Sequence, residues 1–119
     1  MTKKEYLEKI SEKEINAEKV DKIQKAYGSA FSKMVQKIIS NSEETVFFDD
    51  GYRILSYNEI FNAENELHVD FKNKGILPIA DCGENDFIVY HFLDGIWSKF
   101  NIIDETVFKK KDGLDGLLK

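Results

Sequence analysis

The chain contains few of the residues that build disulfides or reactive sites. Its 119 residues include one Cys, one Pro, one Trp and two His. A single Cys cannot form an intrachain disulfide, which excludes the class of small secreted domains that such bonds hold together. We therefore expect a cytoplasmic protein.

Long apolar segments are also missing. No apolar run approaches the roughly 20 residues that a membrane-spanning helix needs, so we expect no membrane association. The first six residues, MTKKEY, lack the apolar segment of a signal peptide. This absence agrees with the expectation of a cytoplasmic protein.

Recognised spacings of catalytic and metal-binding residues are missing as well. His68 and His91 are far apart, and Cys82 supplies no third ligand at the spacing of a known metal site. Gly83 stands alone, so there is no glycine-rich phosphate loop. A Cys82–His91 nucleophile pair could form across a hairpin, but no orienting group or oxyanion donor accompanies it. We therefore expect no metal, no cofactor and no enzymatic activity.

The residues that are present favour one packed domain spanning residues 1–119. Hydrophobic residues make up 42% of the chain, and nine Phe and five Tyr supply large side chains for a core. This composition differs from that of a disordered chain. The length is close to the usual size of one domain.

Residues 75–100 predict the centre of an antiparallel sheet. Apolar runs at 76–80, 87–93 and 96–100 are separated by a turn-rich segment and by Asp94-Gly95, a sequence typical of a type I′ hairpin turn. The 87–93 run is apolar on both faces, which indicates a central strand covered on both sides. Pro78 cannot donate to the sheet, so we expect an edge position or an unpaired site there. Trp97 is expected to be structural or semi-buried, and not catalytic.

The flanking segments predict helices before residue 41 and further strands after it. Asn16 is a candidate N-cap for a helix that ends at Gly28, and capping boxes begin at Thr2, Ser11 and Ser56. Strands are expected at 45–48 and 52–55, a partly irregular connection at 62–74, a strand or loop at 101–108, and a short helix within 112–118. The predicted fold is α+β: an antiparallel sheet of five or six strands, amino-terminal helices packed on one side, and a short carboxy-terminal helix.

Negative charge is concentrated in the middle of the chain. Residues 41–107 hold fourteen acidic side chains and four basic ones, whereas 1–40 and 108–119 each carry net positive charge. A nucleic-acid-binding surface would have the opposite sign, so we expect no nucleic-acid partner. An acidic surface favours a protein partner that is itself basic.

Residues 75–86, GILPIADCGEND, followed by an apolar strand, a tight turn and a strand with Trp97, resemble the central signature of the SUKH superfamily. The signature joins an apolar-Pro-Ile-Ala-acidic segment to a Gly-rich turn, an Asp and an apolar strand. Here the usual run of Gly is reduced to Gly83. The family includes yeast regulators of cell-wall synthesis, and its bacterial members are largely immunity proteins that neutralise a cognate toxin, often a nuclease.

The resemblance implies an immunity protein, and the acidic middle section fits a protein that masks a basic, nucleic-acid-binding surface. A regulatory or scaffold module like the yeast relatives remains an alternative, a small enzyme is a third reading, and the oligomeric state is left open. The candidate partner-binding residues are acids of the predicted turns and connections: Asp49, Asp50, Glu64, Glu66, Asp70, Glu84 and Asp94.

Two further acids, Asp81 and Asp86, flank the family motif. Short acidic side chains in turns often accept hydrogen bonds from their own backbone, so we expect these two to shape the turn. Glu84 lies in the same turn without such a role and is therefore the better candidate for partner contact.

Overall fold

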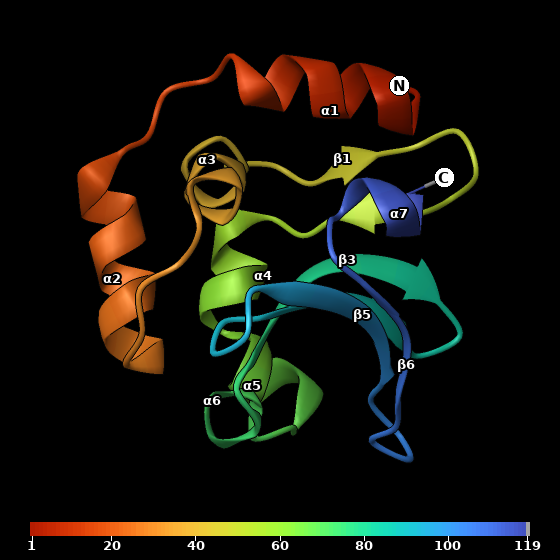
Figure 1. Cartoon of the computed structure of the whole chain (residues 1–119). Coiled ribbons are helices and arrows are strands. Elements are labelled where there is room, and N and C mark those ends of the chain that lie inside the picture. The colour runs from red at the N-terminus through yellow and green to blue at the C-terminus, as the bar shows by residue number, and fades with distance from the viewer. Residues whose placement is uncertain (119) are drawn as a thin grey trace.

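The sheet is an antiparallel meander in which each strand pairs with the next strand of the sequence (Figure 1). The structure is a computed structural model that describes residues 1–118. Its strands are β1 (Val46–Phe47), β2 (Arg53–Ile54), β3 (Ile76–Gly83), β4 (Asp86–His91), β5 (Ile96–Asn101) and β6 (Val107–Lys111). Its helices are α1 (Lys3–Ser11), α2 (Ala17–Tyr27), α3 (Lys33–Ser40), α4 (Tyr57–Phe61), α5 (Ala63–Leu67), α6 (Phe71–Lys74) and α7 (Asp115–Leu118). The predicted α+β fold is confirmed.

The helix ends follow from local chemistry. The Thr2 and Glu5 side chains form the predicted capping box of α1, and the Asn16 side chain caps α2. Gly28 ends α2 with a φ of 68°, a left-handed conformation that glycine adopts without a steric penalty. The capping box predicted at Ser11 is wrong. Ser11 is the last residue of α1, and its hydroxyl donates to a carbonyl of its own helix.

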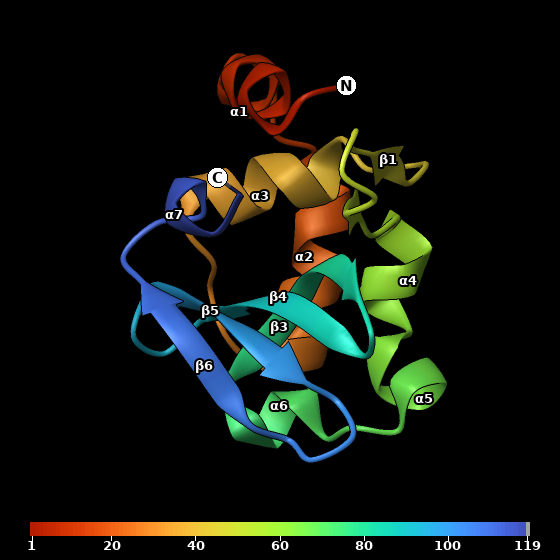
Figure 2. The ribbon, with the colours of Figure 1, turned by 90° about the vertical axis from the view of Figure 1, so that its right-hand side faces the viewer.

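β4 is covered on both faces, as its sequence predicts, because all four residues between its ends are buried. On one face, the Tyr90 ring contacts Phe31 from the α2–α3 connection, with 6.2 Å between ring centroids. On the other face, Phe100 of β5 contacts Phe71 of α6 at 6.0 Å. The sheet is therefore the middle layer of the core, and different helices cover its two sides (Figures 1 and 2).

The type I′ turn occurs in a different hairpin from the one predicted. Glu84 and Asn85 join β3 to β4 with φ values of 53° and 67°, and the residues that flank them pair. Asp94-Gly95 belongs instead to a four-residue loop in which only Gly95 has positive φ. Phe92 causes this difference in the turn. Its N–H donates to the Gly75 carbonyl, and its ring packs against the aromatic rings of Tyr27 and Phe31.

This loop also shortens β4 relative to the prediction. The strand ends at His91, and Leu93 is 78% exposed instead of lying in the sheet. The edge position expected for Pro78 is wrong, because β3 lies between β2 and β4. Pro78 lies opposite Val89, where the β3–β4 register shifts. A β-bulge tolerates a residue without an N–H donor, which agrees with the predicted unpaired site.

Residues 62–74 were expected to be a partly irregular connection, and that expectation missed two short helices, α5 and α6. Residues 68–70 separate them and are irregular, with His68 in the left-handed conformation at a φ of 56°. The Glu64 carboxylate accepts the Lys72 N–H at 2.8 Å, and the Asp70 side chain caps α6. Both side chains therefore cap α6, whereas α5 has no side-chain cap, and both helices are too short to form alone.

Candidate functional site

The meander sorts the candidate acids between two ends of the sheet. Turns of an antiparallel meander alternate between its ends, so the β1–β2, β3–β4 and β5–β6 turns share one end (Figures 1 and 2). We call this the turn end and define it by residues 49–51, 83–85 and 102–106. It carries Asp49, Asp50 and Glu84, whereas Asp94 and the β2–β3 connection that contains α5 lie at the opposite end. α6 packs against the sheet, and its Lys74 reaches Glu105 of the β5–β6 turn.

Two acids of the turn end already have partners within the chain. The Asp49 carboxylate accepts from the amino terminus of Met1 at 3.1 Å. Asp50 forms an ion pair with Lys3, and this bond lowers the pKa of the Asp50 carboxyl. Both acids therefore fasten the start of α1 to the β1–β2 turn, a structural role that sequence reasoning missed.

Glu84 differs from these two acids. It is exposed at the tip of the β3–β4 turn, and its carboxylate has no hydrogen bond or ion pair with any residue between 1 and 118. Its positive φ is uncommon for a residue with a long side chain. The structure therefore presents an unpaired carboxylate on a tight turn.

The two acids that flank this turn, Asp81 and Asp86, both form contacts within the fold. Only Asp81 forms the predicted bond to its own backbone. Asp81 accepts the Gly83 N–H at 2.8 Å, the expected backbone bond, and also lies 3.5 Å from the Arg53 guanidinium. Asp86 accepts from the Asn101 side-chain amide at 2.9 Å, so its bond is to a neighbouring strand and not to its own backbone. Neither acid is as free for partner contact as Glu84.

At the opposite end, the candidate acids divide in the same way. The carboxylates of Glu64 and Asp70 accept backbone N–H groups of α6. Glu66 and Asp94 are exposed and form no hydrogen bond or ion pair with another of the described residues. Only three of the seven candidates, Glu66, Glu84 and Asp94, are therefore free of local structural duties in the described chain.

A basic cluster near the turn end was not predicted. The Lys99 side chain extends from β5 to donate to the Tyr52 hydroxyl at 2.7 Å, and the Lys3 ammonium lies 4.0 Å from the centre of the same ring. Lys99 is 9% exposed. The three residues are far apart in sequence, and no local pattern signals their meeting. They hold together α1, the β1–β2 turn and β5.

Cys82 and His91, the two residues considered for a nucleophile pair, lie apart in the structure. Burial raises the pKa of the Cys82 thiol to about 11, which makes it a poor nucleophile. The strand register places Cys82 and His91 at opposite ends of the β3–β4 hairpin, so they do not form the pair considered above. His91 Nε2 lies 2.7 Å from the Ser98 hydroxyl, but Ser98 is fully buried and unreachable by substrate.

Groups that could hold a metal ion were sought among residues 1–118, and no set of three or more His, Cys, Asp or Glu is found there. Over the same residues, no helix has the length and apolar character needed to cross a membrane.

Comparison of the chain with family models, with curated proteins and with solved structures finds no match in any of the three. The resemblance of residues 75–100 to the SUKH signature accordingly remains a prediction.

Proposed function

We propose that this chain is an immunity protein that binds and neutralises a cognate bacterial toxin through the turn end of its sheet. The toxin has a basic surface, and a nuclease is the class that the resemblance to SUKH proteins favours. The protein acts in the cytoplasm, where such a toxin would reach nucleic acid. Binding alone accounts for this function, and no catalytic step is required.

The observation that carries the proposal is the conformation of Glu84. A Glu in the left-handed region costs about 1 kcal/mol compared with residues that suit a type I′ turn. A residue held in an unfavourable backbone conformation without a structural benefit is a candidate for function. Glu84 has no intrachain partner among the described residues, so its carboxylate is available to a basic group on another protein.

The charge of the surrounding surface supports the same conclusion. Asp104 and Glu105 lie in the β5–β6 turn and are exposed, which places them at the same end as Glu84. Asp49 retains a side chain that is 72% exposed despite its bond to Met1. A partner that approaches this end meets several carboxylates, which favours rapid association with a basic surface.

The proposal is tested with the carboxy-terminal domain of the protein encoded directly upstream as the candidate toxin. Cells that express this domain should stop growing, and co-expression of the chain should restore growth. Glu84→Gln should weaken the purified complex at least about tenfold, or ~1.4 kcal/mol. Glu66→Gln, which removes a free carboxylate at the opposite end, is the matched control and should leave affinity unchanged.

Failure to restore growth, together with no complex between the purified proteins, would contradict the immunity function. A neighbouring cell-wall or metabolic gene cluster in place of a toxin gene would then favour the regulatory or scaffold module. Restored growth with equal loss of affinity in the two variants would contradict the assignment to the turn end and leave the immunity function in place.

A further inference from the structure

The last strand of the meander leaves one side of the sheet open. β6 pairs with β5 on one side, and no other strand among residues 1–118 pairs with its outer side (Figure 2). The other edge strand, β1, has only two residues, whereas β6 has five. The β5–β6 register shifts between Trp97 and Lys99, and Lys109 has a φ of 53°, so β6 contains a bulge. The regular stretch before the bulge, around Val107, still offers unpaired backbone groups to another strand.

One hydrogen bond between β6 and β5 shows which backbone groups of β6 face outward. The Asn101 N–H donates to the Thr106 carbonyl at 3.0 Å, so the backbone groups of Thr106 face β5. Backbone groups of adjacent residues in a strand point to opposite sides, so those of Val107 face outward. Val107 also has a side chain that is 40% exposed.

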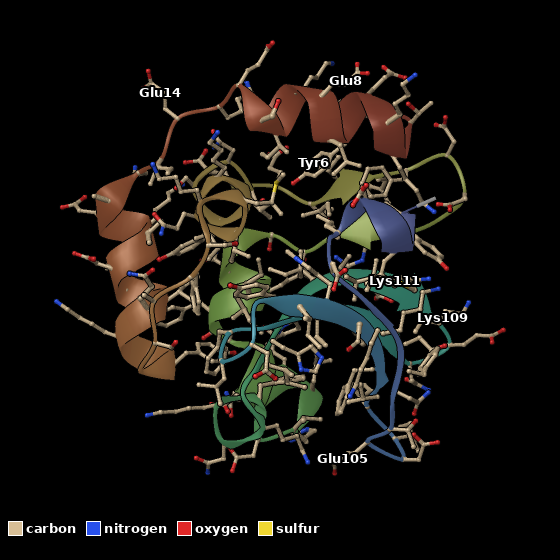
Figure 3. The ribbon with its side chains drawn as sticks, viewed as in Figure 1. Tyr6, Glu8, Glu14, Glu105, Lys109 and Lys111 are labelled. Atoms are coloured by element: carbon tan, nitrogen blue, oxygen red, sulfur yellow. The ribbon has the colours of Figure 1, made fainter. Side chains whose placement is uncertain are left out.

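The β6 edge carries negative charge at its start and positive charge at its end. Asp104 and Glu105 immediately precede β6, and Lys110 and Lys111 end it. Figure 3 shows Glu105 at one end of the strand and Lys111 toward the other. All four residues are exposed. Asp104 accepts from Thr106 and Glu105 forms a 2.7 Å ion pair with Lys74, but exposed pairs of this kind are weak and leave the carboxylates within reach of other cations.

We propose that two copies of this chain associate through their β6 edges, antiparallel and related by a two-fold axis near Val107. In an antiparallel pair, the start of one strand lies beside the end of the other. The acidic turn of each copy would therefore face Lys110 and Lys111 of its partner, twice by symmetry. The occupant of the edge is a second copy because the strand carries its own complementary charges.

The same features limit the assembly to two copies. Two-fold pairing uses β6 of both chains, and only the β1 edges remain at the ends of the joined sheet. Two-residue strands are poor templates for further pairing. Parallel association would instead place the lysines of the two copies together, which like charges disfavour.

The first test is sedimentation equilibrium of the full chain from about 10 μM to about 1 mM at low salt. The weight-average mass should rise from 13.8 kDa toward twice that value, and high salt should reduce the association. A mass that stays at 13.8 kDa over the whole range would overturn the proposal.

The second test uses two charge-reversal variants. One carries Asp104→Lys and Glu105→Lys, and the other carries Lys110→Glu and Lys111→Glu. Each should be monomeric alone because its edge has a single sign, whereas an equimolar mixture should form a heterodimer. A mixture that does not associate while the wild type does would overturn the pairing.

The third test removes one outward donor. Val107→Pro deletes an N–H that faces away from β5, so circular dichroism should show a retained fold and sedimentation a monomer. Val20→Ala, a change in the buried face of α2, controls for general destabilisation and should leave association intact if the protein folds. Should Val107→Pro dimerise as the wild type does, another surface must join the copies.

Discussion

Phe92 is the residue at which tertiary packing most clearly overrides the local turn preference of the sequence. Asp94-Gly95 suits a type I′ turn, and sequence reasoning therefore places the turn there. The Phe92 ring lies 6.0 Å from Tyr27 and 5.9 Å from Phe31, and this packing draws the chain out of the strand early. Burying an aromatic ring contributes a few kcal/mol, whereas the preference of two residues for a type I′ turn contributes about 1 kcal/mol. Ring burial therefore outweighs the turn preference.

Glu84 is the residue where stability and the proposed function should conflict. Glu84→Asn suits the first central position of a type I′ turn and should raise the free energy of unfolding by about 0.5–1 kcal/mol. It should also weaken toxin binding because the carboxylate is lost. Asn85→Gly is the matched control, since it relaxes the same turn by a few tenths of a kcal/mol and leaves Glu84 in place. Urea titration measures the stability of both variants, and a destabilised Glu84→Asn variant would contradict the strain argument.

Trp97 illustrates a residue whose role the sequence does predict. It is 4% exposed, and its ring centroid lies 5.1 Å from that of Tyr90, so it is more fully buried than the semi-buried position expected. Trp97→Phe should lower the free energy of unfolding by about 1–2 kcal/mol through lost packing. Toxin affinity should change less than about tenfold. A folded variant that loses affinity about a thousandfold would show that Trp97 contacts the partner.

Among the elements, the central strands are predictable and the short helices are not. β3, β4 and β5 follow from apolar runs, and the 87–93 run, which is apolar on both faces, also predicts that β4 is covered on both sides. α5 and α6 lack such a pattern, since only Ala63 and Phe71 are buried within them. Glu64 and Asp70 both cap the start of α6, whereas α5 has no side-chain cap, and the Glu64–Lys72 contact between the two helices becomes visible only in three dimensions.

The connection between β2 and α4 contains a pH-sensitive ion pair. The Arg53 guanidinium donates two 2.8 Å bonds to the Glu59 carboxylate, which also accepts the Ser56 N–H. The bond from Arg53 lowers the pKa of Glu59 below its ordinary value of 4.5. A carboxyl with a depressed pKa stabilises the fold above its unfolded pKa, and this contribution is lost as pH falls through the folded pKa.

Acid titration should therefore reveal the contribution of Glu59. Wild-type stability should fall as pH drops below about 4.5, and Glu59→Gln should be less stable at pH 7 and less dependent on pH in the acid range. Glu66→Gln removes an exposed carboxyl with no partner in the described chain and serves as the control. Urea midpoints at several pH values provide the measurement, and parallel pH profiles for Glu59→Gln and wild type would contradict the role of this pair.

For the whole molecule, the sequence shows where acidic residues occur, but it does not predict which of their carboxylates are free to contact a partner protein. Fourteen acids lie between residues 41 and 107, and this count alone favours a basic partner. The structure assigns Asp49 and Asp50 to the attachment of α1 through Met1 and Lys3. Partners more than forty residues away in sequence leave no local pattern, so this division of roles could not be foreseen.

The two groups of acids at the turn end should consequently respond differently to charge reversal. Asp49→Lys with Asp50→Lys should release the start of α1 and lower thermal stability, because both substitutions place cations beside Met1 and Lys3. Glu84→Lys should leave the fold unchanged and slow association with the toxin. Stopped-flow measurements at low and high salt report the on-rate, and circular dichroism reports the fold.

If charge guides association, added salt should slow the wild-type on-rate far more than it changes dissociation, and Glu84→Lys should show a smaller salt dependence. Glu66→Lys changes net charge by the same amount at the opposite end and is the control. Long-range attraction depends on total charge, whereas contact at the turn end depends on position. A larger effect of Glu84→Lys than of Glu66→Lys would therefore locate the interface, and equal effects would reduce the role of Glu84 to its contribution to net charge.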